Sequence, residues 1–368
     1  MTKLTFNRRR FMGTAAMSGA VLASPVYLRS ARAAGGEVNI WTYSDFVPKA
    51  FKEQFEAETG IKVNVRLVDD QGKQFNLLAA EAPNPTVDIM TVAGHRFLQF
   101  IDNDLLAPLD TGRLNNWGNI NPTFSESDWS TINGHKWGAP ILSGMEVLSY
   151  NTELVSAEEA KSWDVLFSEK YSGRTAYIIQ DMMSIVMLKL GYDGNMVEYL
   201  DDPVKAAAIV EEAKQFLISK KQHVRKYYDS GAEIQQMFVN QDIALGHSWN
   251  GPAAALINDG FPLAMTIPRE GSYGFVYTYN IANNAPNVDN AYTFLDAILA
   301  SPEIGAAMTK ASGFISTYKD ASNYLTDREK QSTSFTDEEI SHLQFFRAEA
   351  NKMKYSLVDP AVEAIKAA

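Results

Sequence analysis

The order of hydrophobic and polar positions after residue 34 predicts strands that alternate with helices. Apolar residues recur at a spacing of four over 48–60, a segment that ends at a glycine and indicates an amphipathic helix. Strands are predicted at 37–43, 61–68 and 87–94, and a second helix at 95–106. This order predicts a mostly parallel sheet with helices on both faces.

The second half of the chain repeats this order. A helix over 231–242 is expected to begin after an N-cap at Asp229 or Ser230, because short polar side chains accept hydrogen bonds from the first turn. The predicted elements are a strand at 174–180, a helix at 181–195 and a strand at 243–249. The chain therefore has two α/β modules.

Two segments are expected to connect these modules as hinge crossings, namely 137–153 and 264–282. With them, the chain divides into two lobes. Lobe 1 is expected to comprise 34–147 and 273–318, and lobe 2 to comprise 148–272 and 319–368. Ligands of such folds bind between the lobes, at the carboxyl ends of the strands.

Residues 1–33 have the pattern of an export signal. Three arginines from Arg8 to Arg10 precede a weakly apolar run over 12–28, which is too short to span a bilayer, since about 20 strongly apolar residues are needed. The arginines and the Phe that follows resemble a twin-arginine motif. An ordinary secretory signal is the alternative, and in either case cleavage is expected near Ala33.

Composition narrows the compartment and the class of partner. The chain has no cysteine, which excludes disulfides, thiolate metal sites and a lipid-anchoring cysteine. An exported protein without an anchor is retained where a second membrane encloses it, so we expect the periplasm of a Gram-negative bacterium. The net charge of −11 disfavours nucleic acid as a partner and is compatible with a small cationic ligand.

Seven segments occur in a recognisable order. They are "WTYSDFVPKAFKEQFEAETGIKV", "VDIMTVAG", "SWDVLFSEKYSGRTAYI", "LKLGYDGN", "ALGHSWNG", "IPREGSYGFVYTYNIA" and "AYTFLDAILASPEIGAAM". In this order and spacing they resemble the spermidine- and putrescine-binding proteins of bacterial ABC importers, over nearly the whole chain after Gly36. The pair "LKLGYDGN" and "WNG" is the more specific part of this resemblance.

The resemblance implies a two-lobed α/β fold of the type II periplasmic binding proteins, with mostly parallel sheets and two hinge crossings. It implies that the protein is a monomer that binds a small amine, hands it to an inner-membrane ABC permease and catalyses no reaction. No cofactor and no metal are implied. The same closed form of such a protein also serves membrane chemoreceptors, and the sequence does not separate that role from transport.

Ten residues are candidates for ligand contacts, most of them carried over from the resemblance. Family members hold polyamines with aromatic faces along the alkyl chain and with carboxylates at the ammonium ends. A cation over an aromatic face gains about 0.5 to 2 kcal/mol, and a buried ammonium needs a paired acceptor. The candidates are Tyr43, Asp45, Phe46, His95, Arg96, Gln180, Asp181, Asp229, Trp249 and Tyr277.

Departures from the family pattern keep a second ligand class open. Where the polyamine binders supply an aspartate, this chain has Tyr277 and its neighbours, so at least one expected carboxylate is missing. Arg96 is able to take a carboxylate through a two-pronged contact, with Asp181 or Asp229 taking an ammonium. A zwitterionic amine such as γ-aminobutyrate or an opine is therefore the alternative to a polyamine.

Several candidates also have a purely structural explanation. Trp249 is equally typical of lobe packing, and Tyr277 of a strand that faces the core. Asp45 and Asp229 are typical of helix N-caps. Arg96 is typical of a solvated charge at a helix start.

Two remote alternatives to amine binding remain. Tyr227 and Tyr228 form an adjacent pair of phenols, which are hard ligands suited to ferric iron. The segment 246–251 resembles the nucleophile motif of secreted hydrolases around Ser248, but it has one residue too many between the serine and its second glycine.

Overall fold

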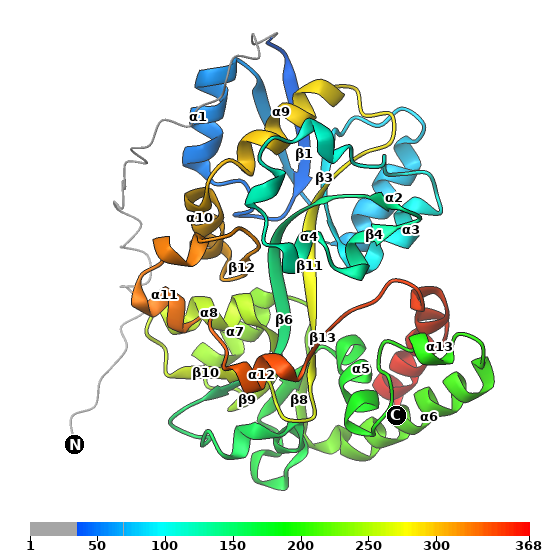
Figure 1. The fold of residues 1–368 in the computed structure, drawn as a ribbon. Helices are drawn as coiled ribbons and strands as arrows, with labels where there is room; N and C mark the ends of the chain where they lie inside the picture. The colour runs from blue at the N-terminus through cyan, green and yellow to red at the C-terminus, as the bar shows by residue number, and fades with distance from the viewer. Residues whose placement is uncertain (1–34, 69) are drawn as a thin grey trace.

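The computed structural model describes residues 35–68 and 70–368. The predicted signal peptide, residues 1–33, lies outside the described residues. Figure 1 shows two α/β halves joined by the long antiparallel strands β6 (Ala139–Asn151) and β11 (Ser272–Ile281). The main sheet has the strand order β2 (Lys62–Leu67), β1 (Glu37–Thr42), β3 (Ile89–Ala93), β11, β6, β9 (Leu245–Trp249), β7 (Thr175–Tyr177) and β8 (Val224–Tyr227).

The first half forms as the apolar periodicity predicts. Strand β1 pairs in parallel with β2 and β3, and Gly60 ends α1 in a left-handed conformation with φ of 70°. The elements are β1 (Glu37–Thr42), α1 (Lys49–Thr59), β2 (Lys62–Leu67), α2 (Gln71–Glu81), β3 (Ile89–Ala93), α3 (Phe97–Ile101), α4 (Pro122–Ser125), β4 (Thr131–Ile132) and β5 (His135–Lys136).

The helix predicted over 95–106 is too long. A 3-10 turn at Gly94–Arg96 leads into α3, which ends at Ile101. Asp104 adopts a left-handed φ of 55°, and Leu106 then forms a bridge with Ala282. An extended residue in a bridge cannot also continue a helix, so the contact to the sheet ends the helical segment.

The second half also repeats the predicted order. Its elements are β7 (Thr175–Tyr177), α5 (Ile179–Lys189), α6 (Pro203–Lys220), β8 (Val224–Tyr227), α7 (Gly231–Val239), β9 (Leu245–Trp249), α8 (Asn250–Asn258) and β10 (Leu263–Thr266). The strand predicted at 174–180 ends at Tyr177, and α5 starts at Ile179. Asp181 therefore lies in the first turn of a helix and not at a strand end. Ser230 caps α7, as one of the two predicted residues.

The C-terminal part of the chain contributes helices and strands to both halves. Its elements are α9 (Val288–Ile298), α10 (Pro302–Ser312), β12 (Ile315–Ser316), α11 (Asp327–Gln331), α12 (Asp337–Ser341), β13 (Leu343–Phe345) and α13 (Asn351–Ala367). Helix α13 packs beside α5 and α6. The crossing expected over 264–282 consists of β10 and β11, with a turn at Gly271 between them.

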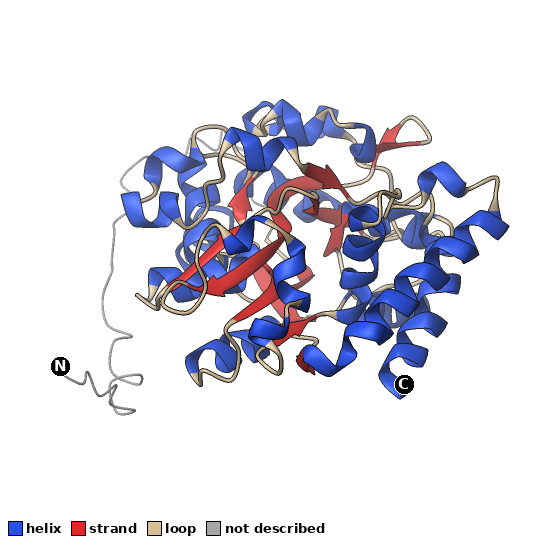
Figure 2. Cartoon of the chain, turned by 90° about the horizontal axis from the view of Figure 1, so that it is seen from below, coloured by secondary structure: helices blue, strands red, loops and turns tan. Residues whose placement is uncertain are grey.

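Two main hydrophobic cores lie on either side of the crossing strands. The first surrounds β1 and β3 and includes Ile40, Phe55 and Phe294. The second lies under α5 and α6 and includes Trp163 and Met183. Figure 2 shows helices on both sides of the strands. Among the described residues, no helix combines the length and the hydropathy that a membrane span requires.

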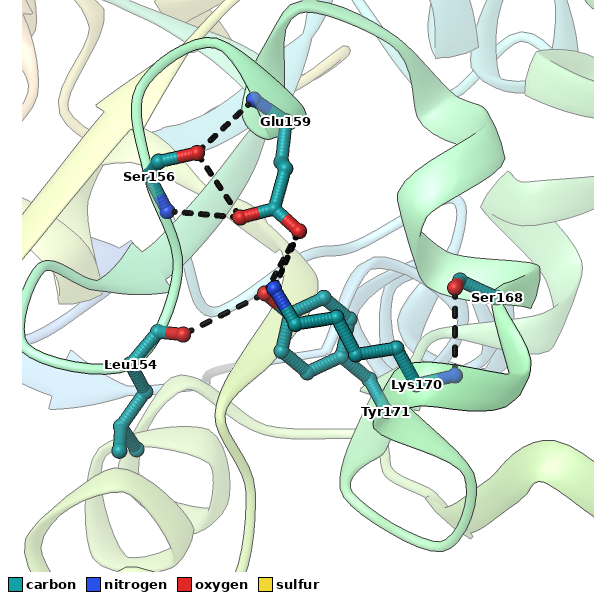
Figure 3. A network of polar contacts seen from close by, with 6 residues as sticks. All are labelled: Leu154, Ser156, Glu159, Ser168, Lys170 and Tyr171. Atoms are coloured by element: carbon teal, nitrogen blue, oxygen red, sulfur yellow. Dashed lines mark hydrogen bonds and ion pairs between the residues drawn. The ribbon is translucent and has the colours of Figure 1, made fainter.

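The irregular segment between β6 and β7 is held by polar contacts at the surface (Figure 3). The Glu159 carboxylate accepts hydrogen bonds from Lys170, from the Ser156 hydroxyl at 2.8 Å and from the Tyr171 hydroxyl at 3.1 Å. The hydrogen bonds from Lys170 and Ser156 lower the pKa of Glu159 to about 2. These contacts order a loop that has no strand partner.

Candidate functional site

Charged and aromatic side chains from four elements meet beside the middle of β6. We call this set the acidic cluster and define it as Glu146, Asp181, His247, Trp249 and Lys354. Glu146 lies on β6, and Asp181 lies in the first turn of α5. His247 and Trp249 lie on β9, and Lys354 lies on α13. Apart from β6, all of these elements belong to the second half of the chain.

Glu146 is the centre of the acidic cluster and is 1% exposed. In the β6–β9 register it lies opposite Trp249, and the period of two places His247 on the same face of β9. Glu146 Oε1 accepts a hydrogen bond from Trp249 Nε1 at 3.1 Å. Oε2 lies 2.6 Å from His247 Nε2, yet neither atom has a well-formed hydrogen bond within the described residues. The carboxyl group therefore retains an unused acceptor.

Burial pushes the acids of the cluster toward their neutral forms. It raises the pKa of Glu146, and it raises the pKa of Asp181 to about 7, with the nearby charge of Glu146 adding to the effect. Burial also lowers the pKa of His247 to about 4. Two acids with raised pKa values in one place indicate a site that is short of positive charge. A bound cation would compensate both carboxylates.

Lys354 is the cation of the cluster. It lies on α13, is 7% exposed, and burial lowers its pKa to about 8. Its Nζ lies 4.9 Å from the centroid of the Phe346 ring, and it forms no ion pair within the described part of the chain. The carboxylates of Asp181 and Glu146 act on it from a distance and oppose the effect of burial.

Aromatic rings border the acidic cluster. Tyr277 packs against Tyr43 and Phe46, with centroid distances of 5.2 Å to each. Phe275 and Phe314 extend this group at 5.2 and 5.6 Å from Tyr277. Burial raises the pKa of Tyr277, and the charges of Tyr43, Glu146 and Asp181 act in the same direction. The ring group and the carboxyl groups are thus neighbours.

The segment Trp249-Asn250-Gly251 ties the site to the crossing strand. Asn250 Oδ1 accepts a hydrogen bond from the Met145 amide at 3.0 Å, and its Nδ2 donates to the Gly313 carbonyl at 3.3 Å. Because Asn250 holds both β6 and the loop after α10, it fixes the position of the adjacent Trp249.

Helix α13 reaches the first half of the chain. Asn351 Nδ2 donates a hydrogen bond to the His95 carbonyl, and the His95 ring lies 5.4 Å from the Phe346 ring. The Arg96 guanidinium lies 5.8 Å from the centroid of the Tyr355 ring. These contacts place the C-terminal helix against both halves, next to the acidic cluster.

The structure brings five of the ten predicted site residues together. They are Tyr43, Phe46, Asp181, Trp249 and Tyr277. His95 and Arg96 border them through α13.

The other three predicted residues are exposed or engaged in other contacts. Asp45 and Asp229 are exposed, and Gln180 Nε2 donates a hydrogen bond to Asp359 on α13. The capping explanations for the two aspartates are wrong. The N-cap position of α1 is Pro48, without a side-chain cap, and Ser230 rather than Asp229 caps α7.

Three members of the acidic cluster were not predicted from the sequence, namely Glu146, His247 and Lys354. Glu146 supplies a carboxylate where at least one was expected to be missing. It is the single charged residue in β6, a strand of 13 residues that is buried throughout, and that isolation was the available signal. Lys354 gave a similar signal, because it occupies a core position of α13 that is followed by Val358 and Ala361.

The remote alternatives find no support in the described residues. Ser248 is 1% exposed, and its hydroxyl lies 2.6 Å from the Ser149 hydroxyl, so its hydrogen-bond partner is another hydroxyl and not a general base. Tyr228 donates to the His247 carbonyl, whereas the ring of Tyr227 packs on Tyr177. Within the described part of the chain, no group of three or more His, Cys, Asp or Glu side chains is arranged to hold a metal ion.

Known proteins similar to this chain share a family with it and a fold. The model of the family described as bacterial extracellular solute-binding protein matches residues 50–336. The spermidine/putrescine-binding periplasmic protein 1 of Haemophilus influenzae is 24% identical over 293 residues, which cover 78% of this chain and 76% of the relative.

Solved structures of similar proteins share the fold. The spermidine/putrescine ABC transporter substrate-binding protein PotD from Streptococcus pneumoniae superposes with a TM-score of 0.76 at 22% identity, over 90% of this chain and 100% of the other. MotA from A. tumefaciens B6, in complex with glucopine, gives 0.69 at 17% identity, over 89% and 99%. These likenesses confirm the predicted two-lobed α/β fold.

Proposed function

The chain belongs to the family of bacterial extracellular solute-binding proteins, and on this premise we propose that it binds a small organic amine between its lobes and delivers it to an ABC-type membrane permease. Proteins of this family bind and transport solutes and are not enzymes. The named relatives bind spermidine and putrescine, so a polyamine is the first class to consider.

The observation that carries this proposal is the pair of buried acids beside aromatic faces. An ammonium group placed next to Glu146 and Asp181 would supply the positive charge that both carboxylates lack. The rings of Trp249 and Tyr277 are suited to cover the alkyl chain of an amine and to attract its cationic end.

A zwitterionic amine is the second candidate, and Lys354 favours it. A buried ammonium inside the cluster is suited to an anionic group of the ligand and repels a second amine. The role first assigned to Arg96 has less support, because its guanidinium donates to Gln99 Oε1 at 3.2 and 2.7 Å. The neighbour that was solved with glucopine belongs to this same fold.

The site works through closure of two lobes, which we propose to be 34–147 with 273–318 and 148–272 with 319–368. The two main hydrophobic cores support this division. Strands β6 and β11 form the crossings. A ligand that touches both lobes favours the closed state only by its differential affinity for that state.

Export accounts for the N-terminal segment. We propose that residues 1–33 are a twin-arginine signal peptide, cleaved near Ala33, and that the mature protein is a periplasmic monomer. The periplasmic relatives support this location.

A thermal-shift panel tests the proposed function. The chain from Ala34 is unfolded and refolded to remove carried ligand, then heated with putrescine, spermidine, γ-aminobutyrate, opines, other amino acids and ferric citrate. A ligand at 1,000 times its Kd adds about 4 kcal/mol to the free energy of unfolding. We expect stabilisation by amines and none by ferric citrate. A panel in which no amine stabilises the chain contradicts the proposal.

Amine affinity is expected to depend on pH through Asp181. Its pKa of about 7 in the free protein means that acid converts it to a neutral form that does not attract an ammonium. Between pH 7.5 and pH 5.5 we expect the affinity to fall by about 25-fold, because the ionised fraction of Asp181 falls by that factor. Titration calorimetry measures this, and Asp181→Asn should bind more weakly and with a flatter profile. An equally steep profile in that variant would assign the effect to another group.

A further inference from the structure

Lys354 is an unusual residue for its position. It faces inward on α13 with Val358 and Ala361, although lysine side chains are seldom buried without a partner. Its Nζ lies over the Phe346 ring, which stacks on Tyr273 at 4.7 Å, and it forms no ion pair with any described residue. The packing of the second lobe therefore holds an ammonium whose donors are not used by a carboxylate.

The acidic groups around Lys354 are engaged elsewhere or too far away to pair with it. Asp193 accepts hydrogen bonds from the amides of Asn195 and Glu198, at 2.8 and 3.1 Å. Glu146 accepts a hydrogen bond from Trp249 through Oε1, and within the described residues neither Glu146 nor Asp181 forms an ion pair with Lys354. From the other lobe, the neutral ring of His95 faces this region and adds no negative charge.

We propose that Lys354 is a specificity-determining residue, which binds an anionic group of the ligand while Glu146 and Asp181 bind its ammonium. This inference rests on the proposed function, because it takes the acidic cluster to be the ligand site. It selects an amino-acid-like zwitterion over a diamine of the same length. A diamine would bring a second ammonium next to a fixed one, whereas a carboxylate would complete the hydrogen bonds of Lys354.

Two ligands with the same carbon skeleton test this inference. γ-Aminobutyrate and putrescine each have a four-carbon chain, and they differ in carrying a carboxylate or a second ammonium. Titration calorimetry at pH 7 on the refolded chain from Ala34 compares both ligands on the original protein, Lys354→Met, Lys354→Arg and Lys352→Met. Lys352 is exposed on the same helix and serves as the control.

We expect the original protein to bind γ-aminobutyrate at least tenfold more tightly than putrescine. Lys354→Met should weaken the affinity for γ-aminobutyrate by at least 30-fold and leave the affinity for putrescine unchanged or higher. The order of the two affinities then reverses. Lys354→Arg should keep the original order, and Lys352→Met should match the original protein for both ligands.

Three outcomes overturn the inference, and they are distinguishable. Tighter binding of putrescine by the original protein rejects the role of Lys354 and leaves the proposed function intact. Equal weakening of both ligands by Lys354→Met assigns the lysine a structural role. Absence of binding by either ligand, and by every amine of the thermal panel, rejects the proposed function as well.

A second measurement covers the case in which Lys354→Met does not fold. In the original protein, raising the pH from 7 to 9 removes the proton of Lys354, whose pKa is about 8. Affinity for γ-aminobutyrate should then fall by about fivefold, because the tenfold loss of charged Lys354 is offset by about a twofold gain in ionised Asp181. The affinity of Lys354→Arg should not fall, because arginine remains charged. A constant affinity in the original protein rejects the inference.

Discussion

Glu146→Gln is expected to weaken amine binding by about 2 to 5 kcal/mol, the usual cost of removing one partner of a buried charge pair. Glutamine keeps the shape of the side chain and an oxygen that accepts from Trp249 Nε1, but it removes the negative charge. Titration calorimetry with the best ligand of the thermal panel measures the loss. Glu153→Gln, on the exposed loop after β6, is the matched control and should bind as the original protein does.

The same variant is expected to be more stable than the original protein when no ligand is bound. Burial raises the pKa of Glu146 in the folded state above its unfolded value of about 4.3, so its contribution to stability falls as the pH rises above that value. At neutral pH an uncharged amide avoids this cost. Weaker binding combined with a higher Tm is the signature of a binding residue. A lower Tm with unchanged affinity would show that Glu146 serves the fold alone.

Gly313→Ala is expected to lower the free energy of unfolding by about 2 to 5 kcal/mol, as the sum of two costs. Gly313 ends α10 with a φ of 73°, a conformation that disfavours any side chain. A Cβ there would lie 2.4 Å from the Gly251 carbonyl oxygen and 3.0 Å from its Cα. Both are backbone atoms of the segment that positions Trp249, so neither can move away cheaply.

Gly60→Ala separates the two costs, because Gly60 ends α1 with a φ of 70° and has no atom within 4 Å of the added Cβ. Gly60→Ala should lower the free energy of unfolding only by the conformational cost, about 1 to 2 kcal/mol. Urea unfolding of both variants measures the difference. Equal losses would mean that the contact between Gly313 and Gly251 yields without cost, and that the site does not depend on it.

The sequence patterns predicted most of the helices and strands of this protein. Phe51 and Phe55 mark the buried face of α1, because burial of one face leaves its period in the sequence. The alternation over 61–68 predicted strand β2 correctly, although Val63 is the one apolar residue within β2 that is buried. The order of these elements was sufficient for the two-lobed fold. The helix predicted over 95–106 ends at Ile101, because a bridge between Leu106 and Ala282 overrides the local preference for a helix.

The candidate site could be predicted from the sequence patterns only in part. Aromatic residues and Asp181 follow predicted elements and were found. Glu146 and Lys354 each stood out as a charged residue among apolar positions, but neither has a partner close in sequence, so the pattern did not indicate what either side chain contacts.

Their meeting was decided by tertiary structure alone. The register of β6 against β9 places Glu146 opposite Trp249, and the packing of α13 against α5 and α6 brings Lys354 to the same place. Local periodicity records which face of an element is buried, but it carries no information about which distant side chain will lie against that face. The balance of charge in the cluster, and with it the class of ligand, therefore arises only when the two lobes and the C-terminal helix are packed together.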